Sequence, residues 1–251
     1  MMQQFNGKVV FITGGTNGMG FATAQEFIRA GARVIITGRS RETVDKAVTA
    51  LGPAATGIVS DAGKMADILA LPAQLQQHTA TIDVLFANAG YGKFAPMEQV
   101  TEAHFDELFD ILVKGTFFTV QQLLPLMTSG GAIILNTSFV TAFGIQHFSV
   151  YTAAKAAVQS FIKTFSMECT AKDIRVNGIS PGYIRTNIFN NTGLSAEEIK
   201  GAVDSVIPTL PYKRFGEPWE IAKTVLFLAS PDAGYIHGAE ILVDGGLSNV
   251  K

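Results

Sequence analysis

The chain has 251 residues, of which 16% are charged, and its formal net charge of -2 offers no broad basic field that would attract nucleic acid. Its one cysteine, Cys169, excludes an intrachain disulfide, and no uncharged apolar run reaches the roughly 18 residues of a membrane helix. We therefore expect a cytoplasmic protein that binds neither nucleic acid nor a membrane.

Seven short apolar runs predict seven β-strands. They span residues 8–13, 33–37, 57–60, 82–87, 131–137, 174–180 and 240–243. Nearly every position is apolar in runs such as Val9-Val10-Phe11-Ile12, which is the pattern of strands buried on both faces of a parallel sheet.

Longer segments between these runs carry apolar residues at helical spacing. They span residues 19–30, 41–51, 64–79, 102–127, 150–170 and 218–229. The alternation predicts a doubly wound α/β fold of the Rossmann type, with seven parallel strands and helices on both faces. Because no linker, repeat or low-complexity stretch interrupts it, residues 1–251 are expected to form a single domain.

One segment, residues 186–215, breaks this alternation. It contains Asn190-Asn191, Pro208 and Pro211, and only residues 195–206 have a modest helical pattern. We interpret the segment as a mobile flap over a substrate, with an ordinary surface excursion as the alternative.

The first predicted strand leads through a glycine-rich turn, Thr13-Gly14-Gly15-Thr16-Asn17-Gly18-Met19-Gly20, directly into a helix. Unencumbered backbone N–H groups at a helix N-terminus, together with the helix dipole, favour a diphosphate. However, glycines at positions 14, 18 and 20 do not follow the generic G-x-G-x-x-G spacing, so the turn alone does not identify a dinucleotide site.

The turn resembles the T-G-x-x-x-G-x-G pattern of the short-chain dehydrogenase/reductase family, and the resemblance continues in order along the chain. Asn88-Ala89-Gly90 follows the fourth strand, Ser138 follows the fifth, Tyr151-x-x-x-Lys155 lies in the next helix, and Pro181-Gly182 follows the sixth strand. The chain resembles 3-oxoacyl-carrier-protein reductases and related NADP-dependent ketone reductases, which implies a small-molecule carbonyl or alcohol substrate.

The turn and the resemblance together imply a set of residues that contact a nicotinamide dinucleotide. These are Gly14, Thr16, Asn17, Gly18, Met19, Gly20, Arg39, Asp61, Ala62, Asn88, Ala89, Gly90, Tyr151, Lys155, Pro181, Gly182, Ile184 and Thr186. The resemblance assigns Asp61 and Ala62 to the adenine, Asn88 and Gly90 to the riboses, and Ile184 with Thr186 to the nicotinamide carboxamide.

The end of the second strand bears on cofactor choice. Gly38 stands where NAD-specific dinucleotide folds present an acid to the ribose 2′-hydroxyl. Arg39, with Arg41 as a second candidate, can form charge-assisted hydrogen bonds with a 2′-phosphate, which a carboxylate at position 38 would repel. We therefore expect NADP(H) to be preferred over NAD(H); the alternative is that Arg39 is a solvated arginine near a helix start.

Ser138, Tyr151 and Lys155 are the expected catalytic residues. Tyr151 and Lys155, four positions apart, project from one helix face, and a nearby ammonium lowers a tyrosine pKa from its ordinary value of about 10. Such a tyrosine can exchange a proton with a carbonyl or alcohol oxygen, while a hydroxyl at the position of Ser138 can stabilise charge on that oxygen. No histidine or cysteine spacing indicates a catalytic metal.

We thus expect an NADP(H)-dependent carbonyl reductase that transfers a hydride, with Tyr151 as general acid and base and Lys155 holding the ribose. One departure from the family is Leu112, because the family usually has asparagine three residues before the glycine at Gly115. The alternative is therefore a catalytically silent dinucleotide-binding sensor or scaffold.

Two further expectations concern the pocket and the assembly. Apolar residues expected above the nicotinamide are Phe94, Val140, Phe143, Ile145, Phe189 and Leu194. Related proteins pair the helices corresponding to residues 102–127 and 150–170 with symmetry mates, which implies a homotetramer.

Overall fold

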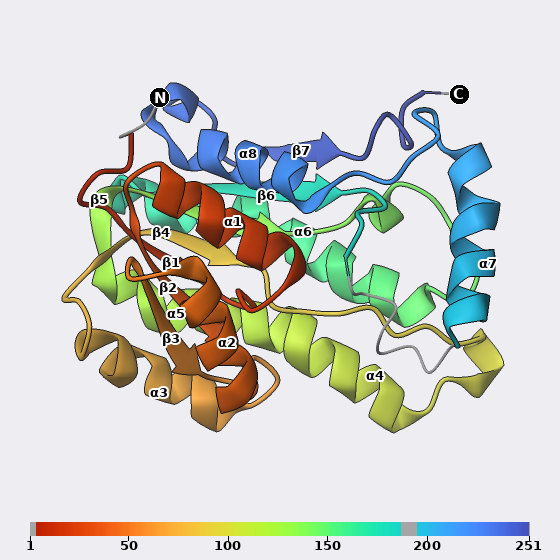
Figure 1. The fold of residues 1–251 in the computed structure, drawn as a ribbon, viewed down its shortest axis with the longest axis horizontal. Coiled ribbons are helices and arrows are strands. Elements are labelled where there is room, and N and C mark those ends of the chain that lie inside the picture. The colour runs from red at the N-terminus through yellow and green to blue at the C-terminus, as the bar shows by residue number, and fades with distance from the viewer. Residues whose placement is uncertain (1–3, 187–194, 251) are drawn as a thin grey trace.

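The computed structural model describes residues 4–186 and 195–250, and its centre is one sheet of seven strands (Figure 1). In chain order these are β1 (Val9–Ile12), β2 (Arg33–Gly38), β3 (Ala55–Val59), β4 (Ile82–Ala87), β5 (Met127–Asn136), β6 (Arg175–Pro181) and β7 (Glu240–Val243). The order across the sheet is β3-β2-β1-β4-β5-β6-β7, and every neighbouring pair is parallel. The doubly wound parallel fold expected from the sequence is confirmed.

Helices cover both faces of the sheet. In chain order the helices are α1 (Gly18–Arg29), α2 (Arg41–Leu51), α3 (Met65–Gln76), α4 (Glu102–Phe109), α5 (Gly115–Leu123), α6 (Ser149–Cys169), α7 (Ala196–Val206), which lies beyond the end of the sheet, and α8 (Pro218–Ala229). Val10 and Ile12 of β1 pack in one core with α1, α2 and α8, whereas Val9 and Phe11 pack in another with α3, α5 and α6. Alternate residues of a strand point to opposite faces, so the all-apolar run fills both cores.

The prediction of one long helix over residues 102–127 is wrong in detail. The structure divides it into α4, a π-helical turn at Asp110–Lys114, α5 and a 3₁₀ turn at Leu124–Leu126 that contains Pro125. Residue 127 already belongs to β5, where it pairs with Ile82 before a register shift. The proline, with no N–H to donate and a ring that crowds the preceding turn, ends the helical run there.

The expected flap is only partly described. Helix α7 confirms the helical pattern at 195–206 and lies at the right-hand end of the view in Figure 1. Phe189, Asn190, Asn191 and Leu194 lie outside the described residues.

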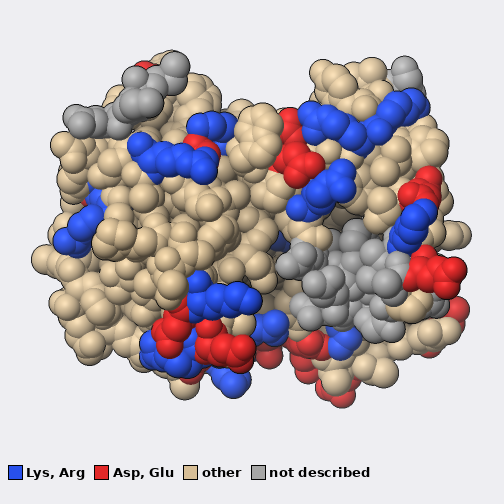
Figure 2. All heavy atoms as spheres, in the orientation of Figure 1, with Lys and Arg blue, Asp and Glu red and all other residues tan. Residues whose placement is uncertain are grey.

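The distribution of charge on the surface and the lengths of the helices relate to two partners, nucleic acid and a membrane, that composition argues against. Lys and Arg side chains are dispersed over the face shown in Figure 2 and do not merge into one basic field. Within residues 4–186 and 195–250, no helix combines the length and apolarity needed to cross a bilayer.

Candidate active site

A cavity of about 260 Å³ opens at the carboxyl ends of the strands. Strand order changes direction between β1 and β4, and parallel sheets leave a crevice at such a switch point. From the expected cofactor set, the cavity wall includes Gly14, Thr16, Asn17, Gly18, Met19, Arg39, Ala62, Asn88, Ala89, Gly90, Tyr151, Lys155, Pro181, Gly182, Ile184 and Thr186. Loops far apart in the sequence therefore meet around one space.

The glycine-rich turn is packed too closely for larger residues. Gly14 and Gly18 have φ angles of +65° and +52°, in the left-handed region that favours glycine. A Cβ on Gly20 would lie 2.3 Å from the Gly14 carbonyl oxygen, so Gly20 serves the packing of the turn and does not line the cavity. The resulting cradle at the start of α1 fits a diphosphate group.

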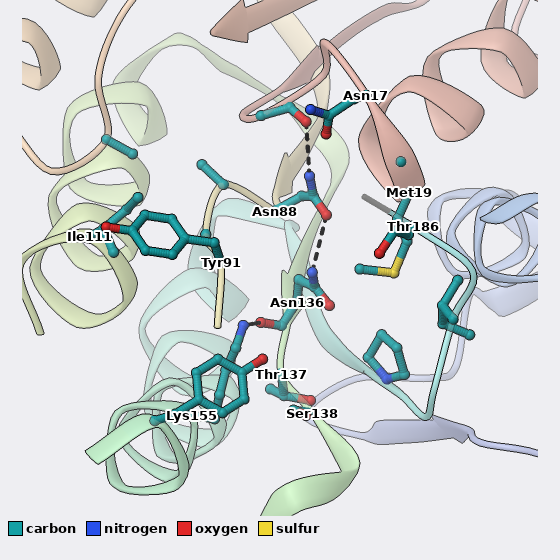
Figure 3. A pocket seen from close by; sticks show the side chains of 18 of the residues that line it. Asn17, Met19, Asn88, Tyr91, Ile111, Asn136, Thr137, Ser138, Lys155 and Thr186 are labelled. Carbon is teal, nitrogen blue, oxygen red and sulfur yellow. Dashed lines mark hydrogen bonds between the residues drawn. The ribbon is translucent and has the colours of Figure 1, made fainter. Parts of the chain in front are cut away.

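Asn88 holds the ends of three strands in register (Figure 3). Its Nδ2 donates to the carbonyl oxygens of Thr13 at 3.0 Å and Gly14 at 3.2 Å. Its Oδ1 accepts from Asn136 Nδ2 at 3.0 Å, as the dashed lines in Figure 3 show. The amide thereby fixes the width of the cavity floor between β1 and β5.

Ser138, Tyr151 and Lys155 converge on this cavity, and all three are buried. Ser138 follows β5, and its hydroxyl oxygen accepts a long, 3.5 Å hydrogen bond from the Val140 N–H. Tyr151 and Lys155 face the cavity from α6. Lys155 Nζ donates to the Asn136 carbonyl oxygen at 2.8 Å and lies 5.9 Å from the centre of the Tyr151 ring.

Burial controls the protonation of this pair. It raises the pKa of Tyr151 to about 12, which a hydrogen bond with Ser138 only partly opposes. Burial also lowers the pKa of Lys155 to about 8. In the cofactor-free protein the pKa of Tyr151 is therefore shifted upward by burial, in the direction opposite to the lowering expected from Lys155.

Comparison with known proteins places the whole chain in one group. A family model described as enoyl-(acyl carrier protein) reductase matches residues 14–248. The chain is 36% identical over 253 residues to oxidoreductase asL5 of Sarocladium schorii, covering 99% of both chains. It is 33% identical over 257 residues to short-chain dehydrogenase/reductase GME11373 of Pestalotiopsis microspora, covering 97% of this chain and 96% of the relative.

The chain belongs to the short-chain dehydrogenase/reductase family. The crystal structure of levodione reductase is also similar, with a TM-score of 0.92 and 32% identity, covering 98% of this chain and 100% of that one. Members of the family are oxidoreductases that use a nicotinamide dinucleotide. The glycine cradle and the residues that line the cavity fit such a group.

At the β2 end of the cavity, this short-chain dehydrogenase/reductase has Arg39 but no acid. A Cβ on Gly38 would lie 2.4 Å from Thr16 Cγ2, so a larger residue at this position would require the Thr16 side chain to move. Arg39 lines the cavity, whereas Arg41 does not and pairs with Asp45 on α2. Of the two arginines expected to contact a 2′-phosphate, Arg39 is therefore the one that lines the cavity.

The adenine edge departs from the expectation in one residue. Ala62 and Ser60 line the cavity, but Asp61 does not. The Asp61 carboxylate accepts a hydrogen bond from the Gly63 N–H at 3.0 Å, which stabilises the loop after β3.

Leu112 lies in the π-helical turn and is fully buried. Its Cδ2 atom is 2.4 Å from where a Cβ on Gly90 would be. Leu112 thus packs directly behind the loop after β4, while its neighbour Ile111 lines the cavity. No sequence motif pointed to Ile111.

The apolar wall was predicted in part. Phe94 and Val140 line the cavity, but Phe143 is 41% exposed and Ile145 packs beside the wall without lining it. Sequence reasoning missed the aromatic residues Tyr91, Phe139, Phe148, Tyr183 and Phe215. Most of them lie within three residues of a motif residue, which is the one signal that could have found them.

Proposed function

We propose that this protein is an NADP(H)-dependent reductase that interconverts a carbonyl compound and its secondary alcohol. The observation that carries the proposal is the convergence of Ser138, Tyr151 and Lys155 on the same cavity as the glycine cradle. The relatives and the similar structure, which are named as oxidoreductases or reductases, support it. The cofactor-binding set proposed is the one given above that lines the cavity.

In the proposed reaction each polar side chain has a separate task. The bound nicotinamide would supply the hydride to the carbonyl carbon. Ser138 donates a hydrogen bond to the substrate oxygen as negative charge develops there, and Tyr151 delivers its hydroxyl proton to the same oxygen. Lys155 holds the cofactor ribose, and solvent protons reach the Tyr151 phenolate through that region to restore it.

The raised pKa of Tyr151 suits proton donation. A pKa of about 12 keeps the hydroxyl protonated at neutral pH, which is the form that reduction consumes. An alkoxide forming on the substrate is a much stronger base than a phenolate, so the transfer remains downhill.

Preference for NADP(H) is proposed from the Arg39 end of the cavity. Arg39 lines the cavity there as a permanent cation, and Gly38 beside it presents no competing carboxylate. An arginine fork can bind a 2′-phosphate in two charge-assisted hydrogen bonds.

Loss of NADPH absorbance with a panel of aldehydes and ketones tests the function. Tyr151→Phe removes the proton donor and should lower kcat by about 10²–10⁴-fold, the range of a general acid. Tyr235→Phe makes the same chemical change at a fully exposed site outside the cavity and should leave kcat unchanged. Tight NADPH binding with no turnover of any substrate would instead favour the sensor or scaffold.

A further inference from the structure

One aromatic group stands on the Tyr151 side of the cavity. Phe94 and Phe148 both line it and stack on each other, with ring centres 4.0 Å apart and an interplanar angle of 18°. Phe94 meets the Tyr151 ring edge-on at 5.5 Å. Both phenylalanines are only partly buried, so each leaves part of a ring for a ligand.

A second aromatic group stands beside Ser138. Phe139, the next residue along the chain, has its ring centre 4.9 Å from that of Tyr183, in the loop after β6. Tyr183 also stacks on Phe215 at 5.4 Å, with an interplanar angle of 22°. All three line the cavity, and Tyr183 is partly exposed to it.

Charge at this wall is scarce. Among the described residues that line the cavity, the only cations are Arg39 and Lys155, and none is an acid. Arg39 stands at the β2 end, and Lys155 is held by the Asn136 carbonyl. An anionic substrate group beside the aromatic rings would lose its water without gaining a cationic partner there, and a cationic group would find no acid to pair with.

From these two aromatic groups we propose that the substrate is an uncharged aryl ketone, a carbonyl conjugated to an aromatic ring. The inference rests on the proposed function and names its substrate class. Conjugation holds the carbonyl in the plane of the ring, so contact with Phe94, Phe148 or Tyr183 also orients the carbonyl toward Tyr151 and Ser138. Each aromatic pair should favour the aryl ketone by about 2- to 13-fold over a saturated ring of the same skeleton.

Two matched pairs of ketones test the proposal with the full-length protein and NADPH: 1-tetralone against 1-decalone, and acetophenone against cyclohexyl methyl ketone. Within each pair the skeleton and the carbonyl position are the same, and only the ring saturation differs. Conjugation makes the aryl member intrinsically the less electrophilic, so a kcat/KM about tenfold higher for it would reflect binding in the cavity. Equal or higher values for the saturated members would overturn the inference while leaving the reductase function intact.

Variants assign the preference to the wall. Phe94→Leu and Tyr183→Leu keep an apolar side chain but remove a ring, and each should lower the aryl-to-saturated ratio by about 2- to 13-fold. Phe143→Leu, an exposed position that does not line the cavity, is the matched control and should leave the ratio unchanged. An equal loss on both members of a pair would show a purely structural effect and count against the inference. Failure of the protein to oxidise NADPH with any ketone would count against the reductase function itself.

Discussion

Lys155 is a buried cation whose removal should alter stability in a way that depends on pH. Its side chain is 5% exposed, and its one hydrogen bond in the described structure is to the Asn136 carbonyl. Burial lowers its pKa from 10.5 to about 8. Holding the charged form in the folded, cofactor-free protein therefore costs about 3 kcal/mol, and Lys155→Met removes that cost.

The direction follows from proton binding. Because the folded pKa lies below the unfolded one, the unfolded chain binds more protons between pH 8 and 10.5, and wild-type stability rises with pH across that window. From pH 7 to pH 9.5 the wild type should gain about 2 kcal/mol relative to Lys155→Met. At pH 7 the variant should be at least as stable as the wild type, because the relieved burial cost roughly equals or exceeds the lost charged hydrogen bond, about 1.5–3 kcal/mol.

Urea unfolding of the cofactor-free protein at pH 7, 8 and 9.5 measures this difference. Lys163→Met changes an exposed lysine on the same helix and should show no such trend. Titration of Tyr151, with its pKa of about 12, acts in the opposite direction but mainly above pH 10, and it is common to both proteins. A stability difference between wild type and Lys155→Met that stays constant from pH 7 to 9.5 would refute the reasoning.

Four other outcomes are expected. Arg39→Leu should raise the Kd for NADPH by about 10- to 150-fold and leave the Kd for NADH nearly unchanged. Nucleotide fluorescence measures both constants, and Arg41→Leu is the control. Equal losses of affinity for both nucleotides would contradict the prediction. Because the Arg39 guanidinium lies 5.5 Å from the centre of the Tyr91 ring, Tyr91→Leu should weaken NADPH binding by about 2- to 5-fold, whereas Tyr91→Phe should not. Leu112→Asn buries an amide and should lower stability by about 1–3 kcal/mol in thermal unfolding. It should change kcat far less than Tyr151→Phe does. An inactive wild type that Leu112→Asn makes active would favour the alternative of a dinucleotide-binding sensor. Light scattering should report a homotetramer at micromolar concentration, and a stable monomer would exclude it.

The sheet was predictable because the central strands bury both faces, so their short apolar runs differ in length and period from the helical segments between them. The segment over residues 102–127 was not, because a π-helical turn and a proline-bearing 3₁₀ turn preserve the apolar spacing of a continuous helix. Residues 128–131 carry two glycines and no apolar run, so nothing in that pattern signals that β5 starts at Met127.

The polar part of the candidate site was predictable because its residues recur at fixed places relative to strand ends. The aromatic wall was not, because Phe139, Phe148 and Tyr183 acquire their positions from loops whose paths no periodicity defines. The structure adds one observation that the sequence does not contain: a side chain at Gly38 would meet Thr16 Cγ2, which would have to move.

The protonation states of Tyr151 and Lys155 could not be predicted from their spacing in the sequence. Their positions on one helix face suggest that a charged lysine draws the tyrosine toward phenolate, yet burial acts on both groups and favours the neutral form of each. In the proposed reaction, a protonated Tyr151 can donate at neutral pH, but very little phenolate is present to remove a proton from an alcohol. Burial, and no charged partner, raises the pKa of Tyr151 in the cofactor-free protein. A cofactor group that stabilises the ammonium form of Lys155 would therefore lower the pKa of Tyr151 and increase the fraction of phenolate.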